Sequence, residues 1–368
     1  MFGVVYSPVK AFKEIVKNPT IKGPLLILVL VLFSMTFEQY VYASKGLRQI
    51  GTPDNDDWTE FISNQHNWTS NGNLLLDGTD YKRGNEVGNH SITSFVPNGT
   101  SIWMRITDIG TFNCSGKRGY TELFFWIKWV HENGTFPSFN ATLRLFSESE
   151  SSYYELDLTN IISNSSNEWS NATANNTTLK IGPGNQEWNP INSPNWESVT
   201  GLEFRLAWPT SANLTMKIDY LHFLKYASLL ETGAFSSGSM IYVLMYGVMN
   251  FCINWFLWGG VLLLVVKAFG EKVGPWKRFF IIIGHVFSIS VIDWLALAAL
   301  LLTLSPFYSV PLWVSQLSFY IFLVIEIWTA VLCSIPIRLL CGITWRRATT
   351  IALIAFSFRF VLRFLLGL

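Results

Sequence analysis

Long apolar runs and a polar, alternating middle divide the chain into two kinds of sequence. Five segments are each about 20 mostly apolar residues long, which is the length at which an α-helix crosses the hydrocarbon core of a bilayer. They are Pro24–Ala43, Met240–Val266, Phe279–Leu304, Leu312–Ile335 and Ala348–Leu366. The pattern predicts a five-helix transmembrane bundle in three sections: residues 1–44 as lead-in and first helix, 45–225 as a separate domain, and 226–368 as the remaining helices.

The middle section alternates apolar and polar residues with a period of two, which is typical of half-buried β-strands. Gly, Pro, Asn and Ser fill the connections between such segments. In one of them, Gly201–Trp208, the apolar residues face one way while Glu203 and Arg205 face the other. Further clear cases are Thr121–Val130, Ala141–Phe146, Tyr153–Leu158 and Leu214–Phe223. Many short strands with turn-rich spacers predict an all-β sandwich or barrel.

Charge is distributed as unevenly as hydrophobicity. Residues 45–225 contain 13 Lys and Arg against 19 Asp and Glu, so the overall charge of +1 combines an acidic middle with a basic frame. The basic residues of the frame gather in three short flanks, Lys10–Lys22, Lys267–Arg278 and Arg338–Arg347. Cytoplasmic flanks of membrane helices are enriched in Lys and Arg, so we expect a cytoplasmic N-terminus, with residues 45–225 and the C-terminus extracellular. An acidic middle domain is a poor nucleic-acid binder, because phosphate contacts need cations.

N-glycosylation sequons support this orientation. Eleven occur, and all lie in the section predicted to be outside: Asn67, Asn89, Asn98, Asn113, Asn133, Asn140, Asn164, Asn171, Asn175, Asn176 and Asn213. We therefore expect N-linked glycans at several of them, although the adjacent Asn175 and Asn176 are not expected to be occupied together. The same section contains a single cysteine, Cys114, which excludes a disulfide within it. The domain must be stabilised by its own core.

Three short stretches in the middle section share features with known sugar-binding folds. They are Val87–Ile92, the pair Asn195–Trp196 before a strand, and the closing strand Thr215–Leu221, in which an Asp lies between apolar residues. Over roughly residues 57–223 the section resembles galactose-binding-like and carbohydrate-binding-module jelly rolls. The resemblance implies a glycan-binding sandwich. Some such modules hold a structural calcium through an early acid and a late Asp, the parts that Asp57 and Asp219 would play here, unless both are simply solvated.

Aromatic residues of the middle section are candidates for a sugar platform, because flat rings stack on the C–H faces of sugars. Phe124 and Trp126 share one face of a predicted strand, while Leu123, Phe125, Ile127 and Trp129 share the other. Only one of the two faces can be the single core, so the other covers a ligand, a loop or another layer. Trp169, Trp188 and Trp196 in turn-rich stretches are further candidates. Ordinary core packing is the alternative for all of them.

The membrane frame contains three motifs outside the middle section. They are Ser7–Ile15 followed by Asn18–Pro19, then Lys267–Lys272 followed by Trp276–Arg278, and finally Arg346–Ala348 at the entry to the last span. With five spans and a cytoplasmic N-terminus, the frame resembles the Yip (Ypt-interacting protein) domain family. Eukaryotic members act in Golgi vesicle traffic and bind Rab proteins, but they lack a large outer insertion. His285 and Phe287 also stand where many relatives carry small residues and a proline. The resemblance therefore implies the fold and not trafficking, and the sequons beside one cysteine suggest an archaeal cell surface.

Ionisable residues within predicted spans are costly and mark candidate functional positions. Asp293, Glu326 and Arg359 lie near the middle of the last three spans, with Arg363 one turn beyond Arg359 and His285 two turns before Asp293. An interhelical ion-pair lock, in which Arg359 bonds to Asp293, Glu326 or both, is the first interpretation. A proton or ion relay with a titrating His285 is the second. Contact between Arg363 and lipid headgroups is a third.

The sequence contains no recognisable catalytic motif. The leading hypothesis is a non-enzymatic, plasma-membrane glycoprotein whose β-domain binds a glycan, a surface-layer component or a partner protein. The alternative is a subunit of a transport or membrane complex that uses the intramembrane charges, and a hydrolytic enzyme ranks third. The expected partners are the lipid bilayer and a surface ligand, with no cofactor beyond glycans and the calcium already named. The sequence leaves the oligomeric state open.

Overall fold

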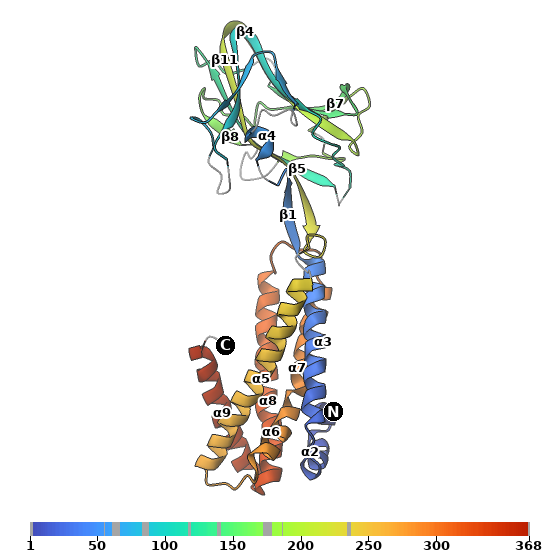
Figure 1. The fold of residues 1–368 in the computed structure, drawn as a ribbon, viewed down its shortest axis with the longest axis vertical. Helices are drawn as coiled ribbons and strands as arrows, with labels where there is room; N and C mark the ends of the chain where they lie inside the picture. Colours follow the sequence, from blue (N-terminus) through green and yellow to red (C-terminus); the bar gives the residue numbers. More distant parts are fainter. Residues whose placement is uncertain are drawn as a thin grey trace. The chain divides into compact units, whose positions relative to one another are not determined.

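The computed structural model describes residues 3–54, 56–60, 67–82, 88–116, 119–137, 141–171, 179–185, 187–233 and 237–366, apart from the side chains of 67, 237, 360 and 362–366. The chain divides into two compact units. Gln49–Ala227 form the β-unit, and Met1–Arg48 with Ser228–Leu368 form the helical unit. Figure 1 shows that the described helices, except one short one, belong to the helical unit, and that strands make up the β-unit.

The helical unit contains four helices that are long and apolar enough to cross a membrane, at Lys22–Lys45, Gly238–Ala268, Trp276–Leu302 and Leu312–Cys341. Its elements are α1 (Gly3–Tyr6), α2 (Pro8–Lys17), α3 (Lys22–Lys45), α5 (Ser237–Ala268), α6 (Trp276–Gly284), the 3₁₀ turn η1 (His285–Ser288), α7 (Ile289–Leu302), α8 (Leu312–Cys341) and α9 (Trp345–Leu366). The first four predicted spans match these helices. The fifth falls in α9, which runs to the limit of the described residues.

The unit is more elaborate than the predicted five-helix bundle. Short helices α1 and α2 precede the first span, and Phe12 of α2 is fully buried. The third span is also interrupted, because η1 separates α6 from α7. The ring Nδ1 of His285 lies 2.9 Å from the carbonyl oxygen of Ile281 and donates to it. This side-chain bond competes for the carbonyl that a regular helix would use at i−4, which accounts for a tighter turn there.

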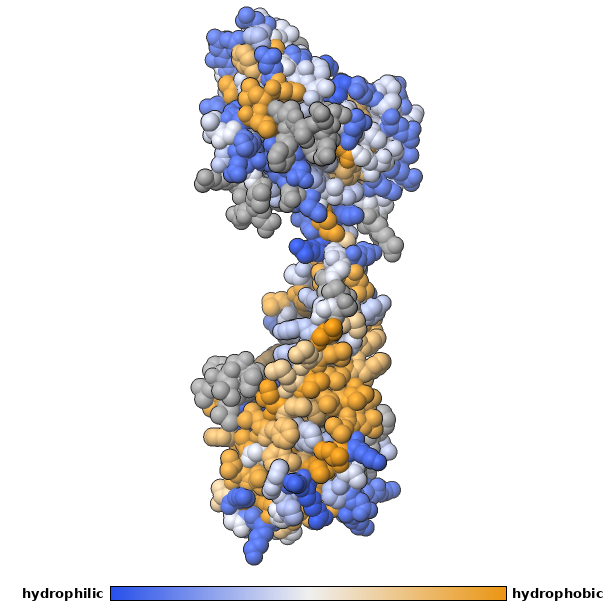
Figure 2. Space-filling model, viewed as in Figure 1, coloured by the Kyte–Doolittle hydropathy of each residue, from blue (hydrophilic) through white to orange (hydrophobic). Residues whose placement is uncertain are grey.

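Two glycines allow α3 to approach the interrupted helix closely. A side chain at Gly23 would collide with the His285 ring, and one at Gly284 would collide with Pro24 and Trp255. Figure 2 shows a largely hydrophobic visible surface on the helical unit, with hydrophilic residues gathered at one end. Large apolar side chains of the helical unit, such as Phe33, Leu264 and Val324, are exposed. A water-soluble protein rarely exposes so much contiguous apolar surface, whereas lipid would cover it.

The β-unit is built on a large antiparallel sheet, which agrees with the predicted all-β class. Two long strands, β4 and β11, take part in both halves of the sheet, and their pairing shifts register between Ala207 and Leu214. The strands are β1 (Leu47–Thr52), β2 (Asn67–Ser70), β3 (Asn73–Asp77), β4 (Ser91–Thr107), β5 (Tyr120–His131), β6 (Thr142–Ser147), β7 (Ser149–Asp157), β8 (Trp169–Asn171), β9 (Leu179–Lys180), β10 (Asn189–Ile191) and β11 (Val199–Ser228), with one short helix, α4 (Asp57–Glu60).

The two halves of the sheet pack against each other through a shared core. One half has the strand order β10-β7-β6-β11-β4-β2. The other half joins β3 to the first part of β4, and the last part of β11 to β5, which pairs with β8 and β9. Phe125 of β5 meets Phe204 of β11 with ring centroids 4.8 Å apart. The core therefore takes the Leu123, Phe125, Ile127 and Trp129 face of β5, which settles the choice between its two faces.

Candidate functional site

A row of charged side chains crosses the outward face of the first half-sheet. Strand pairing places Arg105 of β4 opposite Glu203 of β11, Glu203 opposite Arg144 of β6, and Arg144 opposite Glu155 of β7. Residues directly opposite on one face of a sheet have Cβ atoms about 5 Å apart, close enough to interact. Their neighbours along each strand, such as Met104 and Phe204, point into the core. We call Arg105, Glu203, Arg144 and Glu155 the ionic row.

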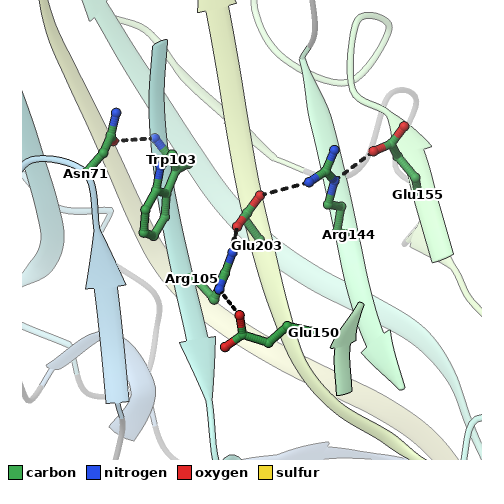
Figure 3. Close-up of polar contacts among 7 residues, drawn as sticks. All are labelled: Asn71, Trp103, Arg105, Arg144, Glu150, Glu155 and Glu203. Atoms are coloured by element: carbon green, nitrogen blue, oxygen red, sulfur yellow. Dashed lines mark hydrogen bonds and ion pairs between the residues drawn. The ribbon is translucent and has the colours of Figure 1, made fainter. Parts of the chain in front are cut away.

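Glu203 is the centre of the ionic row, and its side chain is only 2% exposed. Its Oε2 accepts hydrogen bonds from Nε of Arg105 at 2.9 Å and from Nη2 at 2.5 Å, while Nη1 of Arg144 lies 3.5 Å from Oε1. Each arginine also reaches a second acid, since Arg105 bonds to Glu150 and Arg144 donates to Glu155 at 2.7 Å. Figure 3 shows this chain of contacts across the strands. Both guanidinium groups are thereby fixed in place.

The neighbouring glutamates stabilise the charge of Arg105. Burial by itself would lower the pKa of Arg105, but its bonds to Glu203 and Glu150 more than offset that effect and raise the pKa. Arg105 is therefore a permanent cation. Because carboxylate and guanidinium groups are held in a fixed geometry, the row offers donors and acceptors that need little reordering to bind a polar ligand.

Aromatic rings alternate with the charges on the same outward face. The Arg105 guanidinium lies 5.2 Å from the Trp103 ring and 5.1 Å from the Phe146 ring, and the Arg144 guanidinium lies 4.7 Å from the Tyr153 ring. Trp103 and Tyr153 are half-buried, whereas Phe146 is almost fully covered. The two accessible rings, Trp103 and Tyr153, lie on either side of the ionic row. We call these two rings together with the ionic row the aromatic–arginine face.

Such a face can bind a flat, hydroxylated ligand. The rings supply apolar area at little entropic cost, and the fixed charges supply directional hydrogen bonds at defined positions. The residues involved come from four strands, β4, β6, β7 and β11, so the site is a feature of the folded sheet. The sequence already indicated that Glu203 and Arg205 point away from the core. It did not indicate their neighbours, and none of the aromatic residues named from the sequence belongs to this face.

The aromatic candidates from the sequence fall into two other places. Phe124 and Trp126 lie on the outward face of β5, and the Phe124 ring contacts Tyr220 with centroids 5.6 Å apart. Lys82 Nζ lies 4.5 Å from the Trp126 ring, and Trp169 donates its indole N–H to Asp80 at 3.1 Å. The segment around Asp80 therefore shares this face with Trp126 and Trp169.

The two remaining tryptophans pack with the core. Trp188 is buried and donates its indole N–H to the carbonyl of Lys180 at 2.9 Å. Trp196 stacks on Tyr154, with centroids 3.7 Å apart and an interplanar angle of 11°. In these positions their rings serve packing.

A second charge cluster fixes the segment beside Trp126 and Trp169. Lys217 contacts Asp77 at 2.5 Å and Asp80 at 2.7 Å, and Lys128 contacts Asp80 at 2.9 Å. Partial burial would raise the pKa of Asp77 and Asp80, but the lysine contacts outweigh it and lower the pKa of both carboxyls. Two lysines are therefore neutralised by two aspartates, which leaves a closed ion-pair cluster on this face.

The two acids named as calcium candidates, Asp57 and Asp219, are not neighbours in the structure. Asp219 is almost fully buried, and its neighbour is the buried Asp56, whereas Asp57 is half-exposed at the start of α4. Burial, together with the adjacent Asp219 carboxyl, raises the pKa of Asp56 to about 8, and burial raises the pKa of Asp219 as well. The pair has to hold either a proton or a cation, because two buried carboxylates cannot both remain ionised unaided.

The donor set around this pair is compatible with Ca²⁺ but small. Asp219 Oδ2 accepts the Lys82 N–H at 2.6 Å, while its buried Oδ1 has no hydrogen-bond partner among the described residues. Glu60 is close by, but it accepts the N–H groups of Asn89 and His90. In the part of the chain that the structure describes, no group of three or more acids, histidines or cysteines is arranged to hold a metal.

The sequon asparagines are distributed over the β-unit surface. Six of them have exposed side chains: Asn89, Asn98, Asn113, Asn133, Asn164 and Asn213. Asn171 is half-buried at the end of β8, and Asn67 is described only by its backbone in β2. Asn140, Asn175 and Asn176 lie outside the described residues. The exposed positions are sterically open to modification.

Cys114, the cysteine of the β-unit, is buried, and burial raises the pKa of its thiol to about 12.

Within the helical unit, three of the predicted intramembrane charges line one cavity of about 250 Å³. They are Asp293 of α7, Glu326 of α8 and Arg359 of α9, and they share the cavity with Asn250 and Asn254 of α5. Arg359 donates to Glu326 at 2.5 Å and to the side-chain oxygen of Asn254 at 2.9 Å. The expected pairing of Arg359 with an acid is thus present, with Glu326 as the partner.

His285 and Arg363 are the other two members of the predicted charge cluster. His285 is buried at η1 beside Gly23, bonded to its own helix, and is not among the residues that line the cavity. The Arg363 side chain lies outside the described residues. The Arg359 guanidinium also lies 5.1 Å from the Trp258 ring, so an aromatic residue covers the cation that joins α8 to α9. This arrangement is the interhelical lock that the charge pattern predicted first.

Comparison with known proteins finds weak similarity to solved structures only. No family model matches the chain, and no curated protein sequence matches it. Among solved structures, a family 11 carbohydrate-binding module from Clostridium thermocellum, in complex with a β-1,3-1,4-mixed-linked tetrasaccharide, covers 47% of this chain and 94% of its own, at 7% identity and TM-score 0.27. The xylan-binding domain CBM22-1 of Xyn10C from Paenibacillus barcinonensis covers 46% and 90%, at 13% identity and TM-score 0.19.

An enzyme also appears among the similar structures. The β-1,2-glucanase from Parabacteroides distasonis shares 12% identity over 45% of this chain, with a TM-score of 0.29, and this chain spans only 23% of that enzyme's length. Identities and TM-scores at this level assign no function. The function of this chain is therefore inferred from the chemistry of its own side chains.

Proposed function

We propose that this protein is a membrane-anchored, non-enzymatic glycan-binding protein, in which the aromatic–arginine face of the β-unit is the binding surface. The observation behind the proposal is the placement of Trp103 and Tyr153 beside a fixed row of two guanidinium and two carboxylate groups. Sugars have apolar C–H faces and a rim of hydroxyls, and this surface supplies a partner for each. A protein surface is the second candidate ligand, but it does not offer a regular alternation of apolar C–H faces and hydroxyl groups.

The environment of Glu203 favours binding over hydrolysis. A glycosidase uses two carboxyls that can reach the scissile bond, one of them able to donate a proton. Glu203 is buried and bonded to two arginines. Glu155 is likewise bonded to an arginine. Acids in these positions hold the arginine donors in place and are already occupied by those contacts, so neither is free to reach a scissile bond.

The apolar helices would serve as the anchor. In this proposal they cross the plasma membrane as a Yip-like bundle, α9 is the fifth span, and the β-unit is a jelly roll on the outer side with glycans on its exposed sequons. The proposed setting is an archaeal cell surface, where the ligand is a glycan or a surface-layer component. Glycopeptide mass spectrometry of native material tests the orientation, because six unmodified exposed asparagines would contradict it.

We also propose that Asp56 and Asp219 bind a structural Ca²⁺ in the native environment. Ca²⁺ takes oxygen ligands, and the adjacent carboxyls of Asp56 and Asp219 could share a cation in place of a proton. Its expected effect is a higher melting temperature of the β-unit in millimolar Ca²⁺ than in EGTA at pH 8. The same increase in Asp219→Asn would contradict the assignment, because that variant lacks one ligand charge.

Binding is tested with the full-length protein in detergent micelles against an array of plant, bacterial and archaeal polysaccharides, followed by isothermal titration of each hit. We expect Trp103→Ala and Tyr153→Ala each to weaken binding about 2- to 13-fold, since one stacked ring contributes about 0.5–1.5 kcal/mol. Phe95→Ala is the matched control, because Phe95 is an exposed aromatic residue on the other half of β4. If only Trp126→Ala abolishes binding, the site is the β5 face and the proposal is wrong.

The intramembrane cavity supports a second candidate function, that of a transport or membrane-complex subunit. A cavity of about 250 Å³ with Asn250, Asn254 and Asp293 in its lining can hold several waters or a small polar solute among the helices. Reconstituted vesicles loaded with a pH dye would report proton flux. We expect flux to be lost in Asp293→Asn if this function is real. Equal flux in wild-type and protein-free vesicles would reject it.

A further inference from the structure

One cation beside the ionic row has no carboxylate partner among the described residues. Arg205 of β11 lies on the same outward face as Glu203, two residues along the strand, and is half-buried. Its buried Nε has no hydrogen-bond partner in the described part of the chain. Arg105 and Arg144, by contrast, each bond to two glutamates. The three arginines of this face are therefore not equivalent.

The surroundings of Arg205 explain why no acid of this face neutralises it. Glu203 gives one oxygen to Arg105 and the other to Arg144. Asp157 follows Glu155 on the same side of β7, but its Oδ1 accepts from the N–H of Thr159 at 2.8 Å and from its hydroxyl. Among the described residues, no carboxylate is recorded in contact with Arg205, and its side chain is half-buried on this face.

The residues directly opposite Arg205 complete a small subsite. Strand pairing places Trp103 of β4 on one side and Thr142 of β6 on the other. The buried Thr142 hydroxyl also has no hydrogen-bond partner among the described residues. A stacking ring, a guanidinium and an unsatisfied hydroxyl thus lie in one row across three strands.

We propose that Arg205, Trp103 and Thr142 form a subsite for an acidic sugar, a uronic acid residue whose carboxylate binds Arg205. This inference rests on the proposed glycan-binding function and specifies its ligand class. The planar guanidinium matches a planar carboxylate through two parallel N–H···O bonds, which a neutral hydroxymethyl group cannot accept as well. The sugar ring stacks on Trp103, and Thr142 flanks Arg205 on the other side.

The test compares polyuronates with their carboxyl-reduced counterparts, which have the same backbone without the charge. Full-length protein in detergent micelles is titrated with polygalacturonate, alginate and glucuronan, and with the reduced form of each. We expect wild-type protein to bind at least one polyuronate about 10- to 100-fold more tightly than its reduced form, which is the contribution of a charge-assisted pair. Arg205→Gln should remove that preference while leaving the affinity for the reduced form unchanged.

A matched control and the possible failures separate this inference from the broader function. Lys180→Gln removes an exposed cation from β9 and should alter neither affinity. If wild-type protein binds both forms equally, or if Arg205→Gln weakens both equally, the acidic subsite is wrong while glycan binding stands. If wild-type protein binds neither form nor any neutral glycan of the array, the proposed function itself fails. Equal, Arg205-dependent binding of a sulfated neutral glycan would overturn the preference for carboxylate.

Discussion

Replacing Glu203 by Gln tests whether the ionic row organises the binding face. The variant keeps the shape of the side chain and removes its charge. The wild-type carboxylate, 2% exposed, accepts two hydrogen bonds from Arg105 and a longer contact from Arg144. A hydrogen bond to a charged group contributes about 1.5–3 kcal/mol, and stranding a buried charge costs about 3–5 kcal/mol.

The expected loss of stability in Glu203→Gln is smaller than the sum of the lost hydrogen bonds and the stranded charges, because both arginines have other partners. Their side chains are 23% and 22% exposed, so they keep contact with water, and Glu150 and Glu155 remain bonded to them. We therefore expect Glu203→Gln to lower the free energy of unfolding of the β-unit by about 2–4 kcal/mol. For a domain of this size the melting temperature should fall by about 5–15 °C.

Glu150→Gln is the matched control. Glu150 bonds to the same Arg105, but its side chain is 59% exposed, and an exposed ion pair contributes about 0–1 kcal/mol. Thermal unfolding of the full-length protein in detergent, followed by tryptophan fluorescence, measures both variants, and titration with the best glycan ligand measures their binding. If the two substitutions cost the same, burial of Glu203 does not govern the stability of the row, and the reasoning is refuted.

Three further predictions concern other parts of the molecule. Burial and Asp219 raise the pKa of Asp56 from its ordinary 3.8 to about 8, so between these pH values the folded β-unit holds a proton that the unfolded chain releases. Without Ca²⁺, the free energy of unfolding of the β-unit should therefore fall by about 3 kcal/mol between pH 5 and 7 and level off above pH 8. Asp56→Asn should flatten this melting profile, and an equally steep profile would contradict the cause. Cys114, 1% exposed, should resist maleimide until the β-unit unfolds, and a reducing agent should not shift the melting temperature. Arg359→Leu and Glu326→Leu should be less damaging together than the sum of the single variants, by about 0.5–2 kcal/mol in a double-mutant cycle in micelles, and strict additivity would show that the pair is not coupled.

Sequence patterning predicted local structure well where burial depends on local periodicity. Four predicted spans match helices, and predicted strands such as Thr121–Val130 and Ala141–Phe146 overlap β5 and β6 closely. Two predicted strands, Gly201–Trp208 and Leu214–Phe223, turned out to be parts of the single long strand β11. The Pro209–Ala212 stretch reads as a turn in sequence. In the structure the strand continues through it with a shift in register, which only pairing with β4 defines.

The calcium candidate shows how a one-residue offset escapes a sequence pattern. Asp56 and Asp57 are adjacent, and the pattern of an early acid with a late Asp fits either one. The start of α4 decides between them, since Asp57 is the first helical residue and remains half-exposed, whereas the preceding Asp56 turns inward beside Asp219. Asp56 also accepts a hydrogen bond from the Thr59 hydroxyl, three residues on. This contact and the neighbouring Asp219 depend on the fold, so the sequence alone could not decide between the two acids.

The aromatic–arginine face could not be predicted in the same way, because it depends on register between distant strands. Period-two alternation shows that Arg105, Arg144 and Glu203 point away from the core, but Glu203 lies 98 residues from Arg105 and 59 from Arg144 in the chain. A slip of one residue between β4 and β11 would place Met104 opposite Glu203, turn Arg105 into the core, and leave the buried carboxylate with one arginine fewer. The apolar core and the ionic row therefore select the same register. The contacts that stabilise the sheet are thus the contacts that set the spacing of Trp103, Arg205 and Thr142, so a change that shifts the strands would disturb the core and this face together.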